Sequence, residues 1–369
     1  QMDHILADTK KYVFHNVLSW HHPKNFGCMP STLSHGAVLA DMIGLVLNNP
    51  QHSYSINPAG TELENLMTDW CAKAFNLPSK FLFEKSGGGI IYNSIGEGNL
   101  LVVHSAKFKK MKELGIHRRH PKTLDFVAYH SSHCHYSTPR ALGLIQIPVI
   151  KEVPVTYNPE KKKYEIDIKE FEKLIKSDIE EGLIPFFFGA TIGATATGAA
   201  DPISKLVRLC QKYKMWLNVD AAWAGASFIC KEYYQMYGKG LEGANSIAIN
   251  MGKWLFTGMC AAIFWIDDKE FYQESLAIEP IYLKNTNNEK MINFKDWTIS
   301  TRRRFNSLRI WFVMRSIGLK KIRQNIENNC NVAAFIEKKI KEHDRLELFI
   351  ERELSLVCFR IKKDKKLKD

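Results

Sequence analysis

Residues 215–230 read MWLNVDAAWAGASFIC, an apolar run that ends in an aspartate and continues in small residues. Such a run is typical of a buried strand, and Asp220 stands where that strand should end. A second run, SIAINMGKWLF at 246–256, places Lys253 just after its own apolar segment. A third, LIPFFFGATIGATATG at 183–198, places Thr191 in the same position. Three reactive or hydrogen-bonding side chains therefore follow three predicted strands.

Amphipathic helical segments separate these strands, among them DIKEFEKLIKSD at 167–178 and DPISKLVRLCQKYK at 201–214. Apolar strands that alternate with helices predict an α/β fold, with a mostly parallel sheet covered by helices on both faces. Ligands gather at the carboxyl ends of such strands, so we expect one shared site there. From about Ser307 a pair of helices and two strands predict the start of a second, smaller α+β domain.

Composition favours a globular protein with a large core, because 45% of the 369 residues are hydrophobic. The net charge is +12, but the lysines are scattered and lack the aromatic spacing of single-strand binders, so no nucleic-acid partner is expected. The eight cysteines form no CxxC pair, which favours reduced thiols in a cytoplasmic protein. The opening QMDHILADTKKY lacks the apolar core of a signal peptide, and no membrane association is expected.

A glycine-rich stretch, KSGGGIIYNSIGEGNLLVVHSAK at 85–107, runs into a helix that should begin near Ser94. The start of a helix with small residues can bind phosphate through free backbone N–H groups and the helix dipole. The stretch is not a Walker loop, because no G-K-[ST] follows the glycines. Taken alone it is a weak signal for a phosphate site.

The stretch YHSSHCHYS at 129–137 holds His130, His133, Cys134 and His135. A zinc site needs three or four convergent ligands. Strand alternation places His133 and His135 on one face and His130 on the other, with Cys134 alternating away. This geometry predicts that no metal is bound.

Six segments occur together in an order that resembles the group II pyridoxal-phosphate-dependent decarboxylases, and most closely their aromatic-L-amino-acid decarboxylase branch. They are NPAGTELENLMTDW (57–70), GGGIIYNS (87–94), LIPFFFGATIGATATGAADP (183–202), WLNVDAAWAGASFIC (216–230), NMGKWL (250–255) and RRRFNSLRIWFVMRSIG (302–318). The resemblance covers nearly the whole chain. It implies fold type I of the aspartate aminotransferase superfamily, pyridoxal 5'-phosphate (PLP) as cofactor, and a homodimer with the active site at its interface.

The resemblance also implies roles for individual residues. Lys253 should form the Schiff base with the cofactor, and Asp220 should pair with the pyridine nitrogen. A carboxylate about 4 Å from that proton is worth roughly 4 kcal/mol at an effective dielectric near 20, or about three pKa units. His135 should stack on the ring, with no metal involved. The other cofactor-binding residues implied are Ala222 beneath the ring, Thr191 in the pocket, and Asn250, Ser94, Ile95 and Gly96 around the phosphate.

The implied reaction is decarboxylation of an aromatic L-amino acid to the amine, but one position leaves a second activity open. The catalytic loop should lie in KNTNNEKMINFKDW at 284–297, where Phe294 occupies the expected position of a decarboxylase tyrosine. A phenol can return a proton to Cα and a phenyl ring cannot. In the family, phenylalanine at that position accompanies reaction with O2 to give aldehyde, ammonia and peroxide. An aromatic acetaldehyde synthase is therefore the alternative.

Two departures from the family suggest a third interpretation, a truncated and non-catalytic homologue. Gly252 stands where the family commonly has a histidine, which predicts weaker binding of the cofactor phosphate. The chain also ends after SLVCFRIKKDKKLKD (355–369), where the family normally continues, and it begins without the usual N-terminal helices.

The substrate pocket and the domain boundaries complete the expectations. Trp20, Pro30 and Ser31 fall where relatives line the aromatic pocket, but they do not identify the amino acid. We expect residues 1–35 to pack on the partner subunit, 36–306 to form the large cofactor-binding domain, and 307–369 to begin the small domain.

Overall fold

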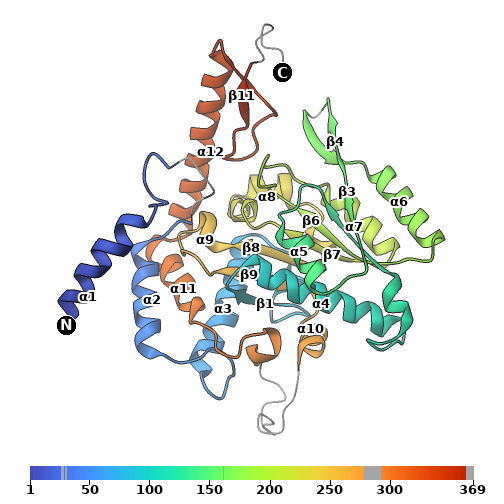
Figure 1. Cartoon of the computed structure of the whole chain (residues 1–369), viewed down its shortest axis with the longest axis horizontal. Helices are drawn as coiled ribbons and strands as arrows, with labels where there is room; N and C mark the ends of the chain where they lie inside the picture. Colours follow the sequence, from blue (N-terminus) through green and yellow to red (C-terminus); the bar gives the residue numbers. More distant parts are fainter. Residues whose placement is uncertain (26–28, 30, 161, 278–291, 363–369) are drawn as a thin grey trace.

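The computed structural model describes residues 1–25, 29, 31–160, 162–277 and 292–362. A seven-stranded sheet with the order β1-β9-β8-β7-β6-β2-β3 forms its centre (Figure 1). Neighbouring strands are parallel except for the two pairs that β9 makes. The strands are β1 (Gly88–Tyr92), β2 (Phe126–Ser131), β3 (Val149–Val153), β6 (Ile184–Thr191), β7 (Trp216–Asp220), β8 (Ser246–Asn250) and β9 (Ala262–Ile266).

Helices cover both faces of this sheet, as the sequence predicts, because successive strand residues point to opposite faces. Ile91, Tyr129 and Trp265 belong to one buried cluster, and their neighbours Ile90 and Ala128 belong to another. The first cluster is completed by α3 (Pro58–Ala74), α6 (Ile168–Glu180) and α7 (Ile203–Lys212). The second is completed by α4 (Ile95–Glu113), α5 (Ser137–Leu144) and α10 (Lys269–Leu276).

Several shorter elements complete the large body. α8 (Lys231–Tyr237) and α9 (Met251–Trp254) follow β7 and β8 along the chain. A separate antiparallel hairpin consists of β4 (Val155–Asn158) and β5 (Lys163–Ile166). Among the residues that the structure describes, we find no helix with the length and apolar character needed to cross a lipid bilayer.

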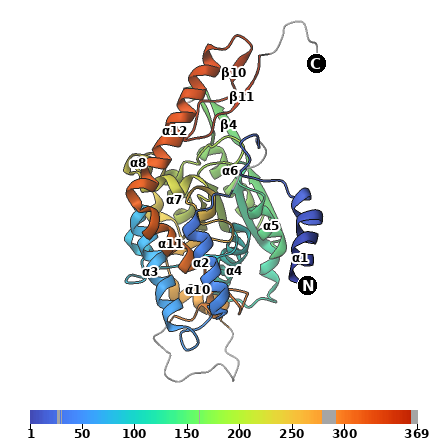
Figure 2. The same cartoon turned by 90° about the vertical axis from the view of Figure 1, so that its left-hand side faces the viewer.

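The two ends of the chain lie at the outside of the body. α1 (Met2–Asp8) has no buried residue and lies at the edge in both views (Figures 1 and 2). α11 (Asn306–Ile317) packs against α2 (His35–Leu47) and α3, so the chain is still part of the large body there. α12 (Leu319–Glu342) then extends away and carries β10 (Leu346–Leu348) and β11 (Phe359–Ile361). We therefore propose a domain boundary near Gly318 in place of residue 306.

A buried ion pair fixes the segment before α11 to the sheet. Arg303 Nη1 donates to Glu64 Oε2 at 3.0 Å, and the two side chains are 7% and 2% exposed. Arg303 also donates to the carbonyls of Gln51 and Ile91, while Glu64 accepts from the Ile91 N–H. The pair therefore joins α3, β1 and the 302–305 segment.

We predict that Glu64→Ala lowers the free energy of unfolding by about 3–5 kcal/mol, because Arg303 would be left buried without its counter-charge. Urea unfolding followed by circular dichroism measures this. Glu170→Ala is the control, because Glu170 pairs with Lys173 at the exposed surface. It should leave the midpoint nearly unchanged. Equal effects of the two substitutions would contradict the assignment.

Candidate active site

A cavity of about 430 Å³ opens where β6, β7 and β8 end. Parallel strands bring their carboxyl ends to one edge of the sheet, so Thr191 at the end of β6 and Asp220 at the end of β7 lie side by side in the register. Every residue predicted to bind the cofactor lines this cavity: Ser94, Ile95, Gly96, His135, Thr191, Asp220, Ala222, Asn250 and Lys253. Their individual roles remain predictions.

Lys253 and Asp220 form the electrostatic centre of the cavity. Burial lowers the pKa of Lys253, and the charge of Asp220 opposes that shift. Burial likewise raises the pKa of Asp220, and Lys253 opposes this. Asp220 Oδ1 also accepts the backbone N–H of Ala222 at 2.9 Å, which fixes the carboxylate. A lysine with a lowered pKa can act as a nucleophile, and a buried carboxylate can hold a proton on a ring nitrogen.

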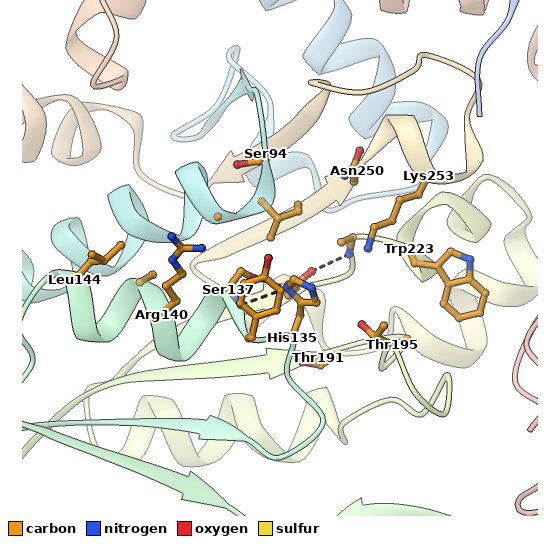
Figure 3. A pocket seen from close by; sticks show the side chains of 17 residues that line it. Ser94, His135, Ser137, Arg140, Leu144, Thr191, Thr195, Trp223, Asn250 and Lys253 are labelled. Atoms are coloured by element: carbon orange, nitrogen blue, oxygen red, sulfur yellow. Dashed lines mark hydrogen bonds between the residues drawn. The ribbon is translucent and has the colours of Figure 1, made fainter. Parts of the chain in front are cut away.

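His135 enters the cavity from the loop that follows β2. Its Nδ1 lies 3.0 Å from Ser137 Oγ, which orients the ring. Burial lowers the pKa of His135 and Lys253 lowers it further, while Asp220 opposes the shift. Figure 3 shows His135, Thr195 and Lys253 directed into one space from three different segments. A neutral imidazole in this place is suited to packing against an aromatic ring.

The neighbouring histidines and the cysteine are occupied by local contacts. His130 Nδ1 lies 3.2 Å from the carbonyl of Ser131 and 3.3 Å from Cys134 Sγ. His133 Nε2 lies 3.2 Å from the carbonyl of Tyr164. The prediction that His135 alone of the three histidines serves the site therefore agrees with where the rings lie.

Ser94 and Asn250 lie at one side of the cavity, next to helix starts (Figure 3). Ser94 Oγ accepts the Glu97 N–H at 3.1 Å as the cap of α4. Asn250 Oδ1 accepts the Gly252 N–H at 3.0 Å as the cap of α9. A Cβ on Gly252 would lie 2.1 Å from the carbonyl oxygen of Gly258, so backbone occupies the space that a side chain would need. The close packing of this loop therefore leaves no room for a histidine side chain at position 252.

Several lining residues were not singled out from the sequence, among them Thr195, Trp223 and Arg140. Thr195 lies in the same hydroxyl-rich loop as Thr191, and Trp223 stacks on Trp254 at 5.4 Å. Arg140 is exposed on α5 and lines the cavity together with the start of α4. It adds a positive charge on the side where a phosphate is expected.

Three predicted residues are not brought to this cavity. Phe294 is 1% exposed and packs against Trp297 with the guanidinium of Arg303 over its ring at 4.9 Å. Trp20 is about half exposed, and Ser31 donates to the carbonyl of Gly252 at 3.2 Å; neither lines the cavity of its own chain. Pro30 and residues 284–291 of the predicted catalytic loop lie outside the described residues.

The donor set fits PLP. Thr191 Oγ1 is buried and has no hydrogen-bond partner among the described residues, so a polar group remains to be satisfied there. A lysine amine, a buried carboxylate and the start of a long helix would meet the aldehyde, the ring nitrogen and the phosphate of the cofactor. These groups line a single cavity.

Comparisons with known proteins agree with this geometry. The chain matches the pyridoxal-dependent decarboxylase conserved domain over residues 1–362. It is 31% identical to the aromatic-L-amino-acid decarboxylase of Catharanthus roseus over 368 residues, which are 98% of this chain and 72% of that protein. It is 33% identical to the phenylacetaldehyde synthase of Petunia hybrida over 365 residues, 98% of this chain and 70% of that protein.

A solved structure agrees with this family assignment. The crystal structure of Oryza sativa TDC with PLP and tryptamine superimposes with a TM-score of 0.93 and 29% identity, over 98% of this chain and 74% of that one. The predicted family, the fold and PLP as cofactor are therefore confirmed.

We predict that Asp220→Asn moves the pH midpoint of the reaction between PLP and the apoprotein to lower pH. The Asp220 carboxylate raises the pKa of Lys253, so its removal lets that pKa fall further. The neutral amine then becomes available at lower pH. Stopped-flow absorbance over a pH series measures the midpoint. Thr195→Val, an uncharged change in the same cavity, should leave it in place. An unchanged or higher midpoint in Asp220→Asn would overturn the coupling.

Proposed function

The chain belongs to the pyridoxal-dependent decarboxylase family, and we propose that it releases CO2 from an aromatic L-amino acid and leaves the amine. The observation that carries this proposal is the pairing of partly buried Lys253 with buried Asp220 near the strand ends, facing the same cavity as His135. The non-catalytic alternative loses its main support, because Gly252 is accommodated by close backbone packing and the reactive residues lie together.

Each residue then has a defined task. Bound PLP supplies the electron-withdrawing ring that stabilises the negative charge left at Cα when CO2 departs. Lys253, whose amine lines the cavity with a lowered pKa, would hold the cofactor through its aldehyde group. Asp220 would keep a proton on the ring nitrogen, and His135 and Ala222 would pack against the ring. Ser94 and the start of α4 would hold the phosphate.

The packing of Phe294 does not support the acetaldehyde synthase alternative. The ring is buried against Trp297 and does not line the cavity, so a hydroxyl added there would lie among core residues. A catalytic role for Phe294 remains a prediction that this packing does not favour. Relatives include an aldehyde synthase as well as a decarboxylase, so the product has to be measured.

One assay separates the activities. The PLP-loaded protein is given phenylalanine, tyrosine, dopa, tryptophan and histidine in turn, and CO2, amine, aldehyde and peroxide are measured together. We expect amine and CO2 in equal amounts with no peroxide. Phe294→Tyr should keep the same product and lower thermal stability, because it buries an unpaired hydroxyl. Equal aldehyde and peroxide that revert to amine in Phe294→Tyr would establish the aldehyde synthase instead.

The same assay extends to Tyr282, the one tyrosine of 278–291, a segment outside the described residues. Peroxide in Tyr282→Phe but not in the parent protein would show that this phenol sets the product. No product from any substrate, in protein that binds PLP, would favour a non-catalytic homologue.

We also propose that the protein works as a homodimer through the apolar surface of α2. Ala37 and Ala40 of this helix are buried against the body. Its other side exposes a continuous row of large apolar side chains: Val38, Leu39, Met42, Ile43, Leu45, Val46 and Leu47. A contiguous apolar surface of this kind is typical of a protein interface. A cytoplasmic location is likewise a proposal, and the free thiols of the described cysteines fit a reducing compartment.

Met42→Asp should weaken self-association tenfold to about a hundredfold, because an unpaired charge would be buried at the interface. Sedimentation velocity over a concentration series measures the dissociation constant. Met236→Asp is the matched control, since Met236 is 65% exposed and Met42 is 59% exposed, but Met236 lies on α8. A monomeric parent protein, or equal effects of the two substitutions, would exclude this surface.

A further inference from the structure

Behind the cofactor cavity, one carboxyl joins the two loops that form its walls. Asp201 does not line the cavity and is only 4% exposed. Its Oδ2 accepts the backbone N–H of Thr191 at 2.8 Å, at the end of β6. Its Oδ1 accepts the hydroxyl of Ser131 at 2.9 Å, at the end of β2. The loop after β2 carries His135, and the loop after β6 carries Thr195.

On the β6 side, Asp201 closes the 191–201 loop at its base. The backbone N–H of Asp201 donates to the carbonyl of Thr191 at 2.8 Å, so the two residues are bonded through both main chain and side chain. Within the loop, the N–H of Ala194 donates to the carbonyl of Ala199 at 2.9 Å. Thr195 follows directly and points into the cavity (Figure 3). The bonds between Asp201 and Thr191 therefore hold the base of this loop in position.

On the β2 side, Ser131 organises the turn that leads to His135. Ser131 Oγ donates to Asp201 and accepts the His133 N–H at 3.1 Å. The carbonyl of Ser131 accepts the Cys134 N–H at 3.0 Å. These bonds of Ser131 fix the turn, and its side-chain bond to Asp201 connects the turn to the other loop. This side-chain bond adds to the main-chain pairing of β2 with β6, the two strands that carry these loops.

A contribution to the stability of the fold does not explain why a carboxyl group stands at position 201. Burial raises its pKa to about 7, with the two hydrogen bonds opposing the shift. No cation pairs with it among the residues that the structure describes. Asp178 offers a contrast, because it is equally buried and binds the strand β2 as well. The hydroxyl of Tyr129 donates to it at 2.6 Å and Lys151 neutralises it, at a place remote from the cavity.

We propose that Asp201 is a positioning residue for the cofactor: it holds the His135 loop and the Thr191–Thr195 loop at the separation that the ring requires. The carboxyl has one oxygen for each loop, so geometry rather than charge is its contribution. This inference rests on the proposed PLP-dependent function. It assigns to Asp201 no contact with cofactor or substrate.

The test compares Asp201→Ala with Asp178→Ala in the full chain. Each variant is examined for the dissociation constant of PLP by absorbance titration, the visible circular dichroism of bound PLP, and the melting temperature of the apoprotein. We expect Asp201→Ala to weaken PLP binding tenfold or more and to change the visible dichroism. Asp178→Ala should lower the melting temperature while PLP binding stays within about twofold of the parent.

Two milder variants keep the proposal testable if Asp201→Ala does not fold. Asp201→Asn retains an oxygen for the Thr191 N–H and an amide that can donate to Ser131 Oγ, so it should keep PLP affinity within about threefold. Ser131→Ala breaks one connection and should lie between the parent and Asp201→Ala. Asparagine as harmful as alanine would show that charge is required, which overturns the positioning role.

The outcomes separate this inference from the proposed function. A parent protein that binds no PLP would refute the function itself. A parent that binds PLP, together with an Asp201→Ala variant whose affinity and dichroism match the parent, would refute the positioning role alone.

Discussion

The site depends on a partly buried lysine whose charged form is favoured by a carboxylate in the same cavity. An ammonium group held away from water is unfavourable, and so is a carboxylate. Lys253 and Asp220 each shift the other's pKa toward the charged form, and burial shifts both the opposite way. The parallel sheet makes this possible, because it ends β7 and β8 side by side. The fold thus assembles a pair of groups that an isolated strand or helix could not bring together.

The loop that follows Lys253 carries conformational strain, and the body stabilises it. Phe256 and Cys260 adopt positive φ values of 62° and 67°, which are unfavourable for side chains with a Cβ. The buried guanidinium of Arg309 donates to the carbonyl of Met259 at 2.6 Å and to that of Thr257 at 3.3 Å. These bonds hold the strained turn against α11. The short helix with Lys253 is therefore fixed at both ends.

The sequence was sufficient to predict the fold and to predict that Thr191, Asp220 and Lys253 share one cavity. The reason is physical. Apolar runs of strand length are visible in sequence, and the residue after each run must lie at the edge of the sheet, as Asp220 and Thr191 do. Arg140 and Thr195 could not be selected, because one of several basic or hydroxyl residues reaches a cavity only through helix and loop geometry. The burial of Phe294 against Trp297 was hidden for the same reason, since the place of a residue in the sequence does not say which way its ring points.

The role of Asp201 was hidden by its surroundings in the sequence. An aspartate before a proline and a helix suggests a local helix cap, and its bonds to Thr191 and Ser131 appear only in three dimensions.

The proposed dimer surface and the catalytic lysine are connected through one short segment. Thr32 donates its N–H to the carbonyl of Gly252 at 2.8 Å, and its hydroxyl accepts the Phe256 N–H at 2.9 Å. Two residues later, Ser34 caps α2, the helix with the exposed apolar face. Because the backbone on both sides of Lys253 bonds to Thr32, a partner that fixes α2 also fixes the segment bonded to the lysine loop. If α2 is the dimer surface that we propose, assembly and preorganisation of the site follow from the same contacts.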